Sequence, residues 1–363
     1  MTSADHKATA DQNDRFSHAF AILEEAVSAQ AFPGAAVAVT YRGEIVALEA
    51  FGRFTYDPES ATVEPNTIYD IASVTKVVAT TTAAMILYDR GALNLDASII
   101  DFFPEFATEP GKQRVTLRML LAHSSGVPAY EKLYKRAATR EELIRLAVRI
   151  PLAAPPLSRA EYSDIGFILL GEILARLAGG PLDTFCAENI FQPLHMTSTS
   201  FCPREAWRPH IPPTIDDRDF RRRIIQGEVH DENASVMGGV SGHAGVFSNA
   251  GDLAQFGLCM LRGGSPLVKA STLELFTRRE TVPQGTTRAL GWDTPSSPSQ
   301  SGQHFSSRSF GHLGYTGTSI WCDPVRQLCV ALLTNRVWPD CSSQAIKYVR
   351  PKFHDAVVTA LEA

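Results

Sequence analysis

The segments that have strand character lie at the two ends of this chain, and those between them have helix character. Apolar and β-branched residues dominate 35–41 and 45–51, and the Arg-Gly turn between them predicts a hairpin. Two more strands are predicted at 318–322 and 328–334, around an Asp-Pro turn. This pattern predicts a single antiparallel sheet built from both ends of the chain.

Between and around the strands, apolar residues recur at helical spacing, and Pro-rich connections separate the segments. Helices are predicted at 16–27, 73–89, 117–122, 140–149, 165–177, 181–190, 253–261 and 343–361. The predicted fold class is therefore α+β. It combines an antiparallel sheet from the N- and C-terminal segments, flanked by helices, with a mainly helical inserted domain.

We place the domain boundaries where this pattern changes. Residues 1–13 are polar and are predicted to form a disordered tail. Residues 14–76 and 235–363 are predicted to form one α/β domain, and residues 77–234 a mainly helical domain. An active site is expected at the interface of the two domains, because concave pockets occur preferentially there.

Charge and hydropathy exclude several classes of partner. With a net charge of −5 and both signs intermixed, the chain offers no basic surface for nucleic acid. No apolar run has the length of a membrane span, and the N-terminal segment lacks the pattern of a secretory signal. We therefore expect a cytoplasmic protein with no nucleic-acid and no membrane partner. The sequence leaves its oligomeric state open.

Metal binding is also disfavoured. His230, Asp231, Glu232 and His243 are of metal-ligating types, but their spacing is not H-E-x-x-H and no third ligand is evident. We assign these four residues to a local turn or to the support of a site. The sequence predicts no metal and no cofactor.

The sharpest chemical feature is an S-x-x-K motif, formed by Ser73 and Lys76 at the start of the predicted helix 73–89. Residues three apart share one helix face, so the amine lies within reach of the hydroxyl. Apolar neighbours would bury the amine and lower its pKa, so that it accepts the serine proton. The motif is short, however, and a helix-capping Ser73 beside a solvated Lys76 explains it equally well.

Two further segments carry residues suited to proton transfer. Tyr162 precedes Ser163 and Asp164 at the start of an amphipathic helix. It either packs against the helix cap or is a phenol whose acidity a nearby ammonium raises. His312 lies in the glycine-rich entry to a strand and is either a polar turn residue or part of a site, since glycine lets a substrate approach a strand edge.

In order and kind, these three elements resemble the motifs of serine penicillin-recognising hydrolases of the class C β-lactamase type. That family, which includes family VIII esterases and D-aminopeptidases, carries S-x-x-K, then Y-x-N, then K-T-G or H-T-G. Further segments of the chain resemble the same family, among them LLAHSSGVP, YSDIGFILLGEIL, GGVSGHAGVFSNAGDLAQF and LLTNRVWP.

The resemblance implies a mechanism. Ser73 attacks a carbonyl carbon to form an acyl-enzyme, and Lys76 and Tyr162 share its proton. The oxyanion lies between the backbone N–H groups of Ser73 and Tyr315. Tyr162 then delivers a proton to the leaving group and later activates the deacylating water.

On the strand side, the resemblance implies that His312 faces the phenol and that Gly314 keeps the strand edge clear for substrate. Three positions depart from the family pattern. Asp164 replaces an Asn that donates an N–H group to the substrate amide. His312 replaces the lysine of class C β-lactamases, and Leu313 replaces a Thr that binds the β-lactam carboxylate. Each departure weakens recognition of a β-lactam.

We therefore expect a serine hydrolase that acts through an acyl-enzyme on a small-molecule ester or amide, with esterase-like or transacylase activity. A D-stereospecific aminopeptidase, a DD-peptidase or a weak β-lactamase is the alternative among enzymes. A non-catalytic scaffold or sensor with the same fold is the alternative outside them. The presence of Ser73, Lys76, Tyr162 and His312 together favours the enzyme.

Overall fold

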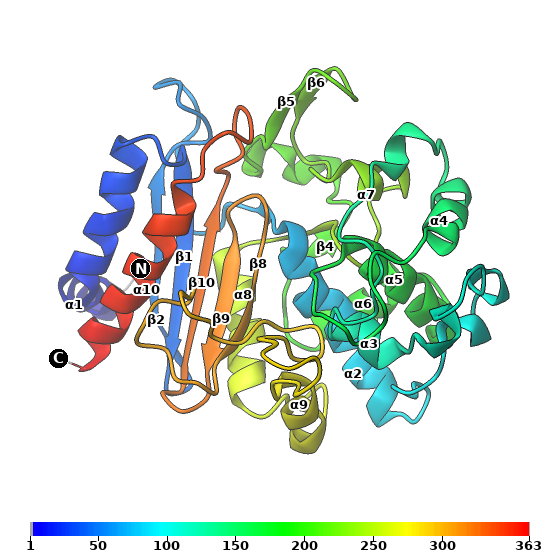
Figure 1. Cartoon of the computed structure of the whole chain (residues 1–363). Helices are drawn as coiled ribbons and strands as arrows, with labels where there is room; N and C mark the ends of the chain where they lie inside the picture. Colours follow the sequence, from blue (N-terminus) through cyan, green and yellow to red (C-terminus); the bar gives the residue numbers. More distant parts are fainter. Residues whose placement is uncertain (1–2, 363) are drawn as a thin grey trace.

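The main sheet is built from the two ends of the chain, as the sequence predicts. The computed structural model describes residues 3–362, with side chains from Arg15 onward. Five antiparallel strands follow the order β2-β1-β10-β9-β8 (Figure 1). The strands are β1 (Gly34–Tyr41), β2 (Glu44–Gly52), β8 (Phe310–Leu313), β9 (Ser319–Asp323) and β10 (Leu328–Thr334). The predicted α+β class is confirmed.

Strand β10 shows how the sheet divides the core. Successive side chains of a strand point to opposite faces. Val330 and Leu332 therefore belong to one apolar cluster, and Ala331 and Leu333 to a second, larger one on the other face. A strand buried on both faces needs the continuous apolar sequence by which this strand was predicted.

Helices cover both faces of the sheet. Helices α1 (Ser3–Ser28) and α10 (Ile346–Glu362) lie side by side on one face, and α8 (Ala250–Leu261) packs on the other (Figure 1). Phe16 and Phe353 anchor the first pair in the smaller cluster. The sheet is therefore the middle layer of three at this end of the molecule.

The N-terminal helix is longer than the sequence predicted. Helix α1 begins at Ser3, so residues 3–13, for which we predicted a disordered tail, are helical. Met1 and Thr2 lie outside the described residues. The segment contains neither proline nor glycine. A helix that Phe16 already anchors can therefore extend outward residue by residue without a new nucleation step.

The middle of the chain gathers beside the sheet as a mainly helical region (Figure 1). Its helices are α2 (Thr82–Asp89), α3 (Leu117–Leu121), α4 (Arg140–Arg149), α5 (Asp164–Ala178), α6 (Leu182–Cys186) and α7 (Glu232–Val236). A further helix, α9 (Ala270–Thr277), packs against α2. The division of the chain into two domains at 77 and 235 stays a prediction.

Short strands complete the structure and connect the helical region to the site. They are β3 (Tyr69–Asp70), β4 (Ser200–Phe201), β5 (Ile215–Asp217), β6 (Arg223–Ile225) and β7 (Val246–Ser248). Strand β7 pairs with β3, directly before the S-x-x-K motif. Within residues 3–362 no single helix has the length and apolar composition of a membrane span, although the bent pair of α5 with the segment from α6 meets both conditions.

Candidate active site

One helical run carries the S-x-x-K motif. It begins with a 3₁₀ turn, η1 (Ala72–Val74), continues as a π-helical segment, η2 (Lys76–Thr81), and ends as α2. The helix predicted at 73–89 is therefore present, but only its last part is α-helical. π-Helical segments are rare and are found frequently at functional sites.

Three of the predicted side chains meet at one oxygen. Lys76 Nζ lies 3.0 Å from Ser73 Oγ, one turn away as the spacing predicted. The Tyr162 hydroxyl, which reaches the same oxygen from the segment before α5, donates to Ser73 Oγ at 2.7 Å. The serine hydroxyl thus has an amine and a phenol in direct hydrogen-bond reach, which is the contact a nucleophile and its proton carriers require.

The amine of Lys76 is completely buried and has three partners. Besides Ser73 Oγ, it donates to Asp164 Oδ1 at 2.7 Å and to the backbone oxygen of His243 at 2.9 Å. Burial lowers the pKa of Lys76, although the Asp164 carboxylate opposes this effect. A neutral amine carries two N–H groups and one lone pair. If Asp164 and His243 take the two N–H groups, the lone pair points to the serine hydroxyl.

Asp164 has a contact that the sequence did not predict. It stands where the family pattern has a substrate-binding asparagine, and it lines the cavity, so a role in binding substrate stays a prediction. Its Oδ1, however, is engaged by the Lys76 amine in an ion pair. The reason is local, because Asp164 is the first residue of α5 and the Tyr162 segment brings that helix start against the buried amine. Asp164 thus accepts a hydrogen bond from Lys76, and it is the counter-ion of that amine whenever the amine is protonated.

Tyr162 is a weaker acid than we predicted. Its pKa is raised well above the usual value, mainly by burial and further by the Asp164 carboxylate, while Arg288 acts in the opposite direction. We had expected an ammonium to raise its acidity. A protonated phenol at neutral pH is suited to donate a proton to a leaving group.

His312 lies in the site but is neutral and buried. Its ring centroid is 5.9 Å from that of Tyr162, so it faces the phenol as expected. Burial, with Lys76 and Arg288, holds its pKa well below the usual value. Nδ1 pairs with the Leu313 carbonyl at 2.8 Å, and Nε2 has no hydrogen-bond partner among the described residues. This tautomer leaves Nε2 as an unused acceptor.

The turn between β8 and β9 packs directly on the motif. The Thr318 hydroxyl donates to the Ile71 carbonyl at 2.9 Å. A Cβ at Gly314 would lie 1.9 Å from Thr318 Oγ1 and 2.5 Å from the Ile71 carbonyl oxygen. The close approach of this turn to the motif therefore requires Gly314, which also lines the cavity; its role in keeping the strand edge clear for substrate stays a prediction. The Tyr315 N–H has no backbone partner among the described residues, and its side chain is exposed.

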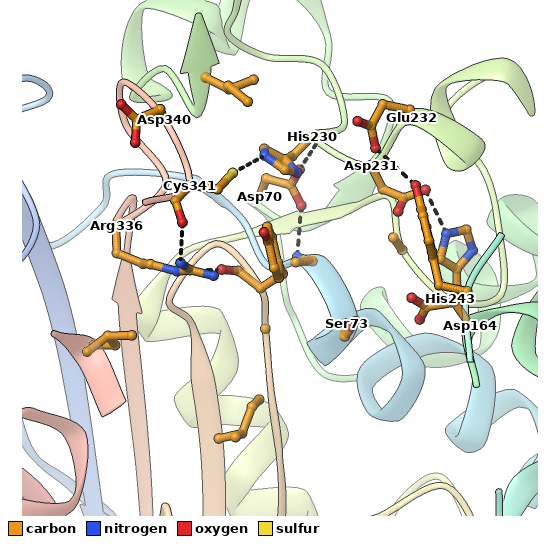
Figure 2. Close-up of a pocket in the computed structure, with 18 of the residues that line it drawn as sticks. Asp70, Ser73, Asp164, His230, Asp231, Glu232, His243, Arg336, Asp340 and Cys341 are labelled. Atoms are coloured by element: carbon orange, nitrogen blue, oxygen red, sulfur yellow. Dashed lines mark hydrogen bonds and ion pairs between the residues drawn. The ribbon is translucent and has the colours of Figure 1, made fainter. Parts of the chain in front are cut away.

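These groups open into one large cavity of about 1210 Å³, whose lining includes Ser73, Tyr162, His312 and Tyr315. Figure 2 shows its two sides: Asp231 and Glu232 on one, and Arg336, Asp340 and Cys341 on the other. Pockets for drug-sized ligands reach about 1,000 Å³. The cavity therefore has room for a substrate much larger than a simple short-chain ester.

Sequence analysis missed three residues around the Tyr162 ring and the motif. The Tyr162 ring has His123 at 4.8 Å and the Arg288 guanidinium at 5.4 Å, measured to the ring centroid. Arg288 is paired with Asp293. His123 lies within the LLAHSSGVP segment, although its role was not recognised, whereas no local motif marks Arg288. Asp70 could have been found, since a carboxylate three positions before Ser73 is visible in the sequence.

Asp70 holds the backbone just before the nucleophile. Its Oδ1 accepts the Ala72 N–H at 2.8 Å, and its Oδ2 accepts the His230 N–H at 2.6 Å. Ala72 has a φ of +46°, a left-handed conformation that costs a residue with a side chain about 1–2 kcal/mol. Burial raises the pKa of Asp70 to about 6, against the effect of the two N–H groups.

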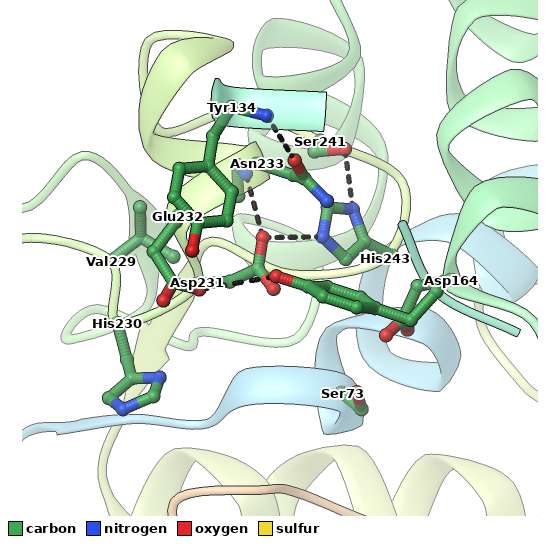
Figure 3. Close-up of polar contacts among 12 residues, drawn as sticks. Ser73, Tyr134, Asp164, Val229, His230, Asp231, Glu232, Asn233, Ser241 and His243 are labelled. Atoms are coloured by element: carbon green, nitrogen blue, oxygen red, sulfur yellow. Dashed lines mark hydrogen bonds and ion pairs between the residues drawn. The ribbon is translucent and has the colours of Figure 1, made fainter. Parts of the chain in front are cut away.

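The cluster that the sequence analysis considered for metal binding forms hydrogen bonds instead (Figure 3). Asp231 Oδ1 contacts His243 Nε2 at 2.7 Å, and Ser241 Oγ contacts His243 Nδ1 at 2.8 Å. Within the described part of the chain, no three His, Cys, Asp or Glu side chains are arranged to hold a metal ion. The assignment of these residues to turns and support of a site agrees with their contacts.

Comparisons with known proteins identify the family. A family model described as Beta-lactamase matches residues 19–349. The N-acetylmuramyl-L-alanine amidase of Bacillus subtilis (strain 168) is 34% identical over 348 residues, covering 85% of this chain and 78% of that protein. A putative D-alanyl-D-alanine carboxypeptidase of Escherichia coli (strain K12) is 33% identical over 343 residues, covering 84% of this chain and 79% of that protein.

Solved structures share the fold at lower identity. EstCE1, a hydrolase with promiscuous acyltransferase activity, superposes with a TM-score of 0.76 at 21% identity, covering 98% of this chain and all of that one (100%). A class C beta lactamase from Rhodobacter sphaeroides superposes with a TM-score of 0.73 at 21% identity, covering 95% and 99%. Because the family model spans most of the chain and both curated relatives match more than four fifths of it, this chain belongs to the Beta-lactamase family of serine hydrolases.

Proposed function

We propose that this enzyme hydrolyses amide bonds of small acyl-amino-acid or peptide substrates, of the kind found in peptidoglycan fragments, through an acyl-enzyme on Ser73. The observation that carries the proposal is the convergence of the Lys76 amine and the Tyr162 hydroxyl on Ser73 Oγ, at 3.0 and 2.7 Å. Two relatives that match along most of the chain are named as an amidase and a carboxypeptidase, which supports amide substrates. The size of the cavity also suits such substrates.

The proposed acylation uses the groups in the order of their contacts. The neutral Lys76 amine takes the hydroxyl proton of Ser73 while Oγ attacks the carbonyl carbon. The backbone N–H groups of Ser73 and Tyr315 stabilise the oxyanion. Tyr162 gives its proton to the departing amine as the C–N bond breaks, and the Lys76 ammonium returns a proton to Tyr162. Water then attacks the acyl carbon while Tyr162 and Lys76 take its proton, the bond between that carbon and Ser73 Oγ breaks, and the proton passes to Oγ as the carboxylic acid leaves.

Ester hydrolysis is a second candidate, and one observation favours it. Asp164 is paired with Lys76, so no side-chain amide at this position donates to the substrate amide. An ester needs less assistance, because an alkoxide is a weaker base than the nitrogen anion that an amide would release without protonation. A structural neighbour described as a hydrolase with acyltransferase activity supports the same chemistry.

The test compares an amide and an ester on the same enzyme. N-acetylmuramyl-L-alanine, followed by release of alanine, and p-nitrophenyl butyrate are the two probes, and a fluorophosphonate labels the nucleophile for intact-mass analysis. We expect labelling and both activities to disappear in Ser73→Ala. Ser309→Ala is the matched control, because Ser309 is buried and lies outside the cavity.

Two results would overturn parts of this proposal. Turnover of either substrate by Ser73→Ala at the wild-type rate would remove the nucleophile from Ser73. Ester turnover without any amide turnover would leave the acyl-enzyme in place and move the function to the second candidate. Cephalosporin turnover is expected to be slow, because Leu313 and Asp164 lack the hydroxyl and the amide of the family motifs.

A further inference from the structure

His243 accepts a hydrogen bond from Lys76 through its backbone oxygen, and hydrogen bonds hold both ring nitrogens of its side chain. The His243 carbonyl accepts from Lys76 Nζ at 2.9 Å. The imidazole of the same residue contacts Asp231 Oδ1 through Nε2 and Ser241 Oγ through Nδ1, at 2.7 and 2.8 Å (Figure 3). His243 is buried. The direction of this carbonyl is therefore set by contacts of the side chain on the same residue.

Asp231 is the fixed point of this arrangement. Its Oδ1 also accepts the Ala234 N–H at 2.7 Å and so caps helix α7. Burial acts against the charge, but His243 and the Ala234 N–H hold the pKa of Asp231 well below its usual range. The residue is therefore an anion at neutral pH. It also lines the cavity beside the motif (Figure 2).

The loop from His230 to Gly242 is hydrogen-bonded on both sides of the S-x-x-K motif, to Asp70 of β3 before it and to Thr80 after it. At one end, the His230 N–H donates to Asp70, which also holds Ala72 next to the nucleophile. At the other end, the Thr80 hydroxyl donates to the Gly242 carbonyl at 2.6 Å, one residue before the oxygen that receives the amine. A shift of the loop would therefore move the acceptor of the amine relative to the serine.

Ser241, His243 and Asp231 have the residue types of a hydrolytic triad, but they do not form a second nucleophile. The Ser241 side chain is buried, at 1% exposure, and is not among the residues that line the cavity. A nucleophile must reach the substrate carbonyl. The three side chains form a chain of hydrogen bonds with His243 in the middle. The backbone carbonyl of His243 faces Lys76.

We propose that Asp231 and His243 are positioning residues that direct the lone pair of Lys76 at the hydroxyl of Ser73. The neutral amine has two N–H groups, and the His243 oxygen and Asp164 Oδ1 accept them. The third direction is then the one toward Ser73 Oγ. This inference rests on the proposed function, in which Lys76 is the general base.

Two substitutions of Asp231 separate geometry from charge. Both hydrogen bonds of this residue, to Ala234 and to His243, end on Oδ1. Asp231→Asn keeps an oxygen that accepts both bonds and removes only the charge. Asp231→Ala removes both bonds, and it releases His243 as well as the helix cap.

Asp231→Ala should lower kcat for p-nitrophenyl butyrate about 100-fold, the size of effect known for a misplacement of about 1 Å, with KM almost unchanged. Asp231→Asn should keep kcat close to wild type. Its pH profile should differ, however, because the Asp231 charge raises the pKa of Lys76. The acid limb of kcat/KM should therefore move to lower pH in this variant.

The other charged groups that act on the amine stay constant in this comparison. Asp164 raises the pKa of Lys76 and Arg288 lowers it. Tyr162 and His312 face the same space and are protonated and neutral, respectively, at neutral pH. His230 and Glu232 are the neighbours of Asp231 in the chain. The backbone N–H of His230 donates to Asp70, and the carboxylate of Glu232 accepts from the Tyr130 hydroxyl at 3.4 Å.

The matched control is a buried carboxylate outside the cavity. Asp252 accepts the Ser198 N–H and the Thr199 hydroxyl at 2.8 and 2.7 Å. Asp252→Ala and Asp252→Asn should lower the melting temperature without a change in the pH profile.

Lys76→Ala is measured in parallel. If Lys76→Ala stays active, the base assignment fails. If Lys76→Ala is inactive but folded Asp231→Ala keeps the wild-type kcat, the positioning role fails alone. Equal losses of kcat in Asp231→Asn and Asp231→Ala would also overturn it.

Discussion

Replacing Asp70 by Asn should change how the stability of the enzyme depends on pH. The side chain is buried, and burial raises its pKa from 3.8 to about 6, with a further contribution from the Asp231 charge and opposition from the His230 and Ala72 N–H groups. The difference between 3.8 and about 6 corresponds to about 3 kcal/mol. The folded state therefore binds this proton more tightly than the unfolded state does.

The sign follows from this difference. A carboxyl with a raised pKa in the folded state stabilises fully below pH 4 and loses that contribution as the pH rises to about 6. Asp70→Asn lacks the titration, so relative to wild type its free energy of unfolding should improve by about 2–3 kcal/mol between about pH 4 and pH 7.5. The amide also meets one N–H donor without an acceptor, which costs about 1–3 kcal/mol at every pH and does not affect the slope.

Urea unfolding of both proteins at the two pH values, followed by tryptophan fluorescence, measures this difference. Every other titrating group is shared by the two proteins and cancels in the comparison. If the free energies of unfolding of wild type and Asp70→Asn differ by the same amount at both pH values, the claim that burial raises the pKa of Asp70 is refuted.

Three further substitutions have directions that the contacts define. Tyr162→Phe removes the hydroxyl bonded to the nucleophile, so kcat for the amide should fall about 10²–10⁴-fold, and an unchanged kcat in steady-state assays would contradict the proton transfer. Asp164→Asn removes a charge that raises the pKa of Lys76, so the acid limb of the pH–kcat/KM profile should move to lower pH; a move to higher pH would contradict the ion pair. Gly242→Ala places a Cβ 2.1 Å from the Phe167 carbonyl oxygen. It should destabilise the fold by about 1–3 kcal/mol in thermal melts, and an unchanged melting temperature would contradict that contact.

The sheet was predictable because its signals are local. The hairpin before residue 52 and the buried strands near the C-terminus each show strand composition bounded by a turn. The extent of α1 was not predictable, because residues 3–13 have a polar composition that fits a tail as well as the outer turns of a helix anchored at Phe16. The first turns of the motif helix were also predicted as ordinary α-helix, since sequence spacing does not distinguish a π-helical segment.

The site was predictable only where its partners are close in sequence or carried by the family resemblance. Ser73 and Lys76 are three residues apart, so helix geometry alone brings them together. The acceptor on His243 was not predictable, because a backbone oxygen has no sequence signature and this one comes from a distant loop. The pKa of Tyr162 was predicted in the wrong direction, because the depth of its burial depends on tertiary packing.

The pairing of β1 with β10 has a consequence for biosynthesis. A ribosome releases the β1–β2 hairpin well before β10, so the edge of β1 that will receive β10 stays open until residues 328–334 have been made. Ser73 and Lys76 emerge early, whereas Tyr315, which we propose as an oxyanion donor, emerges only with the last strands. A nascent chain therefore carries Ser73 long before it has Tyr315, and hydrolytic competence is expected only after the segment from β8 to β10 has been made.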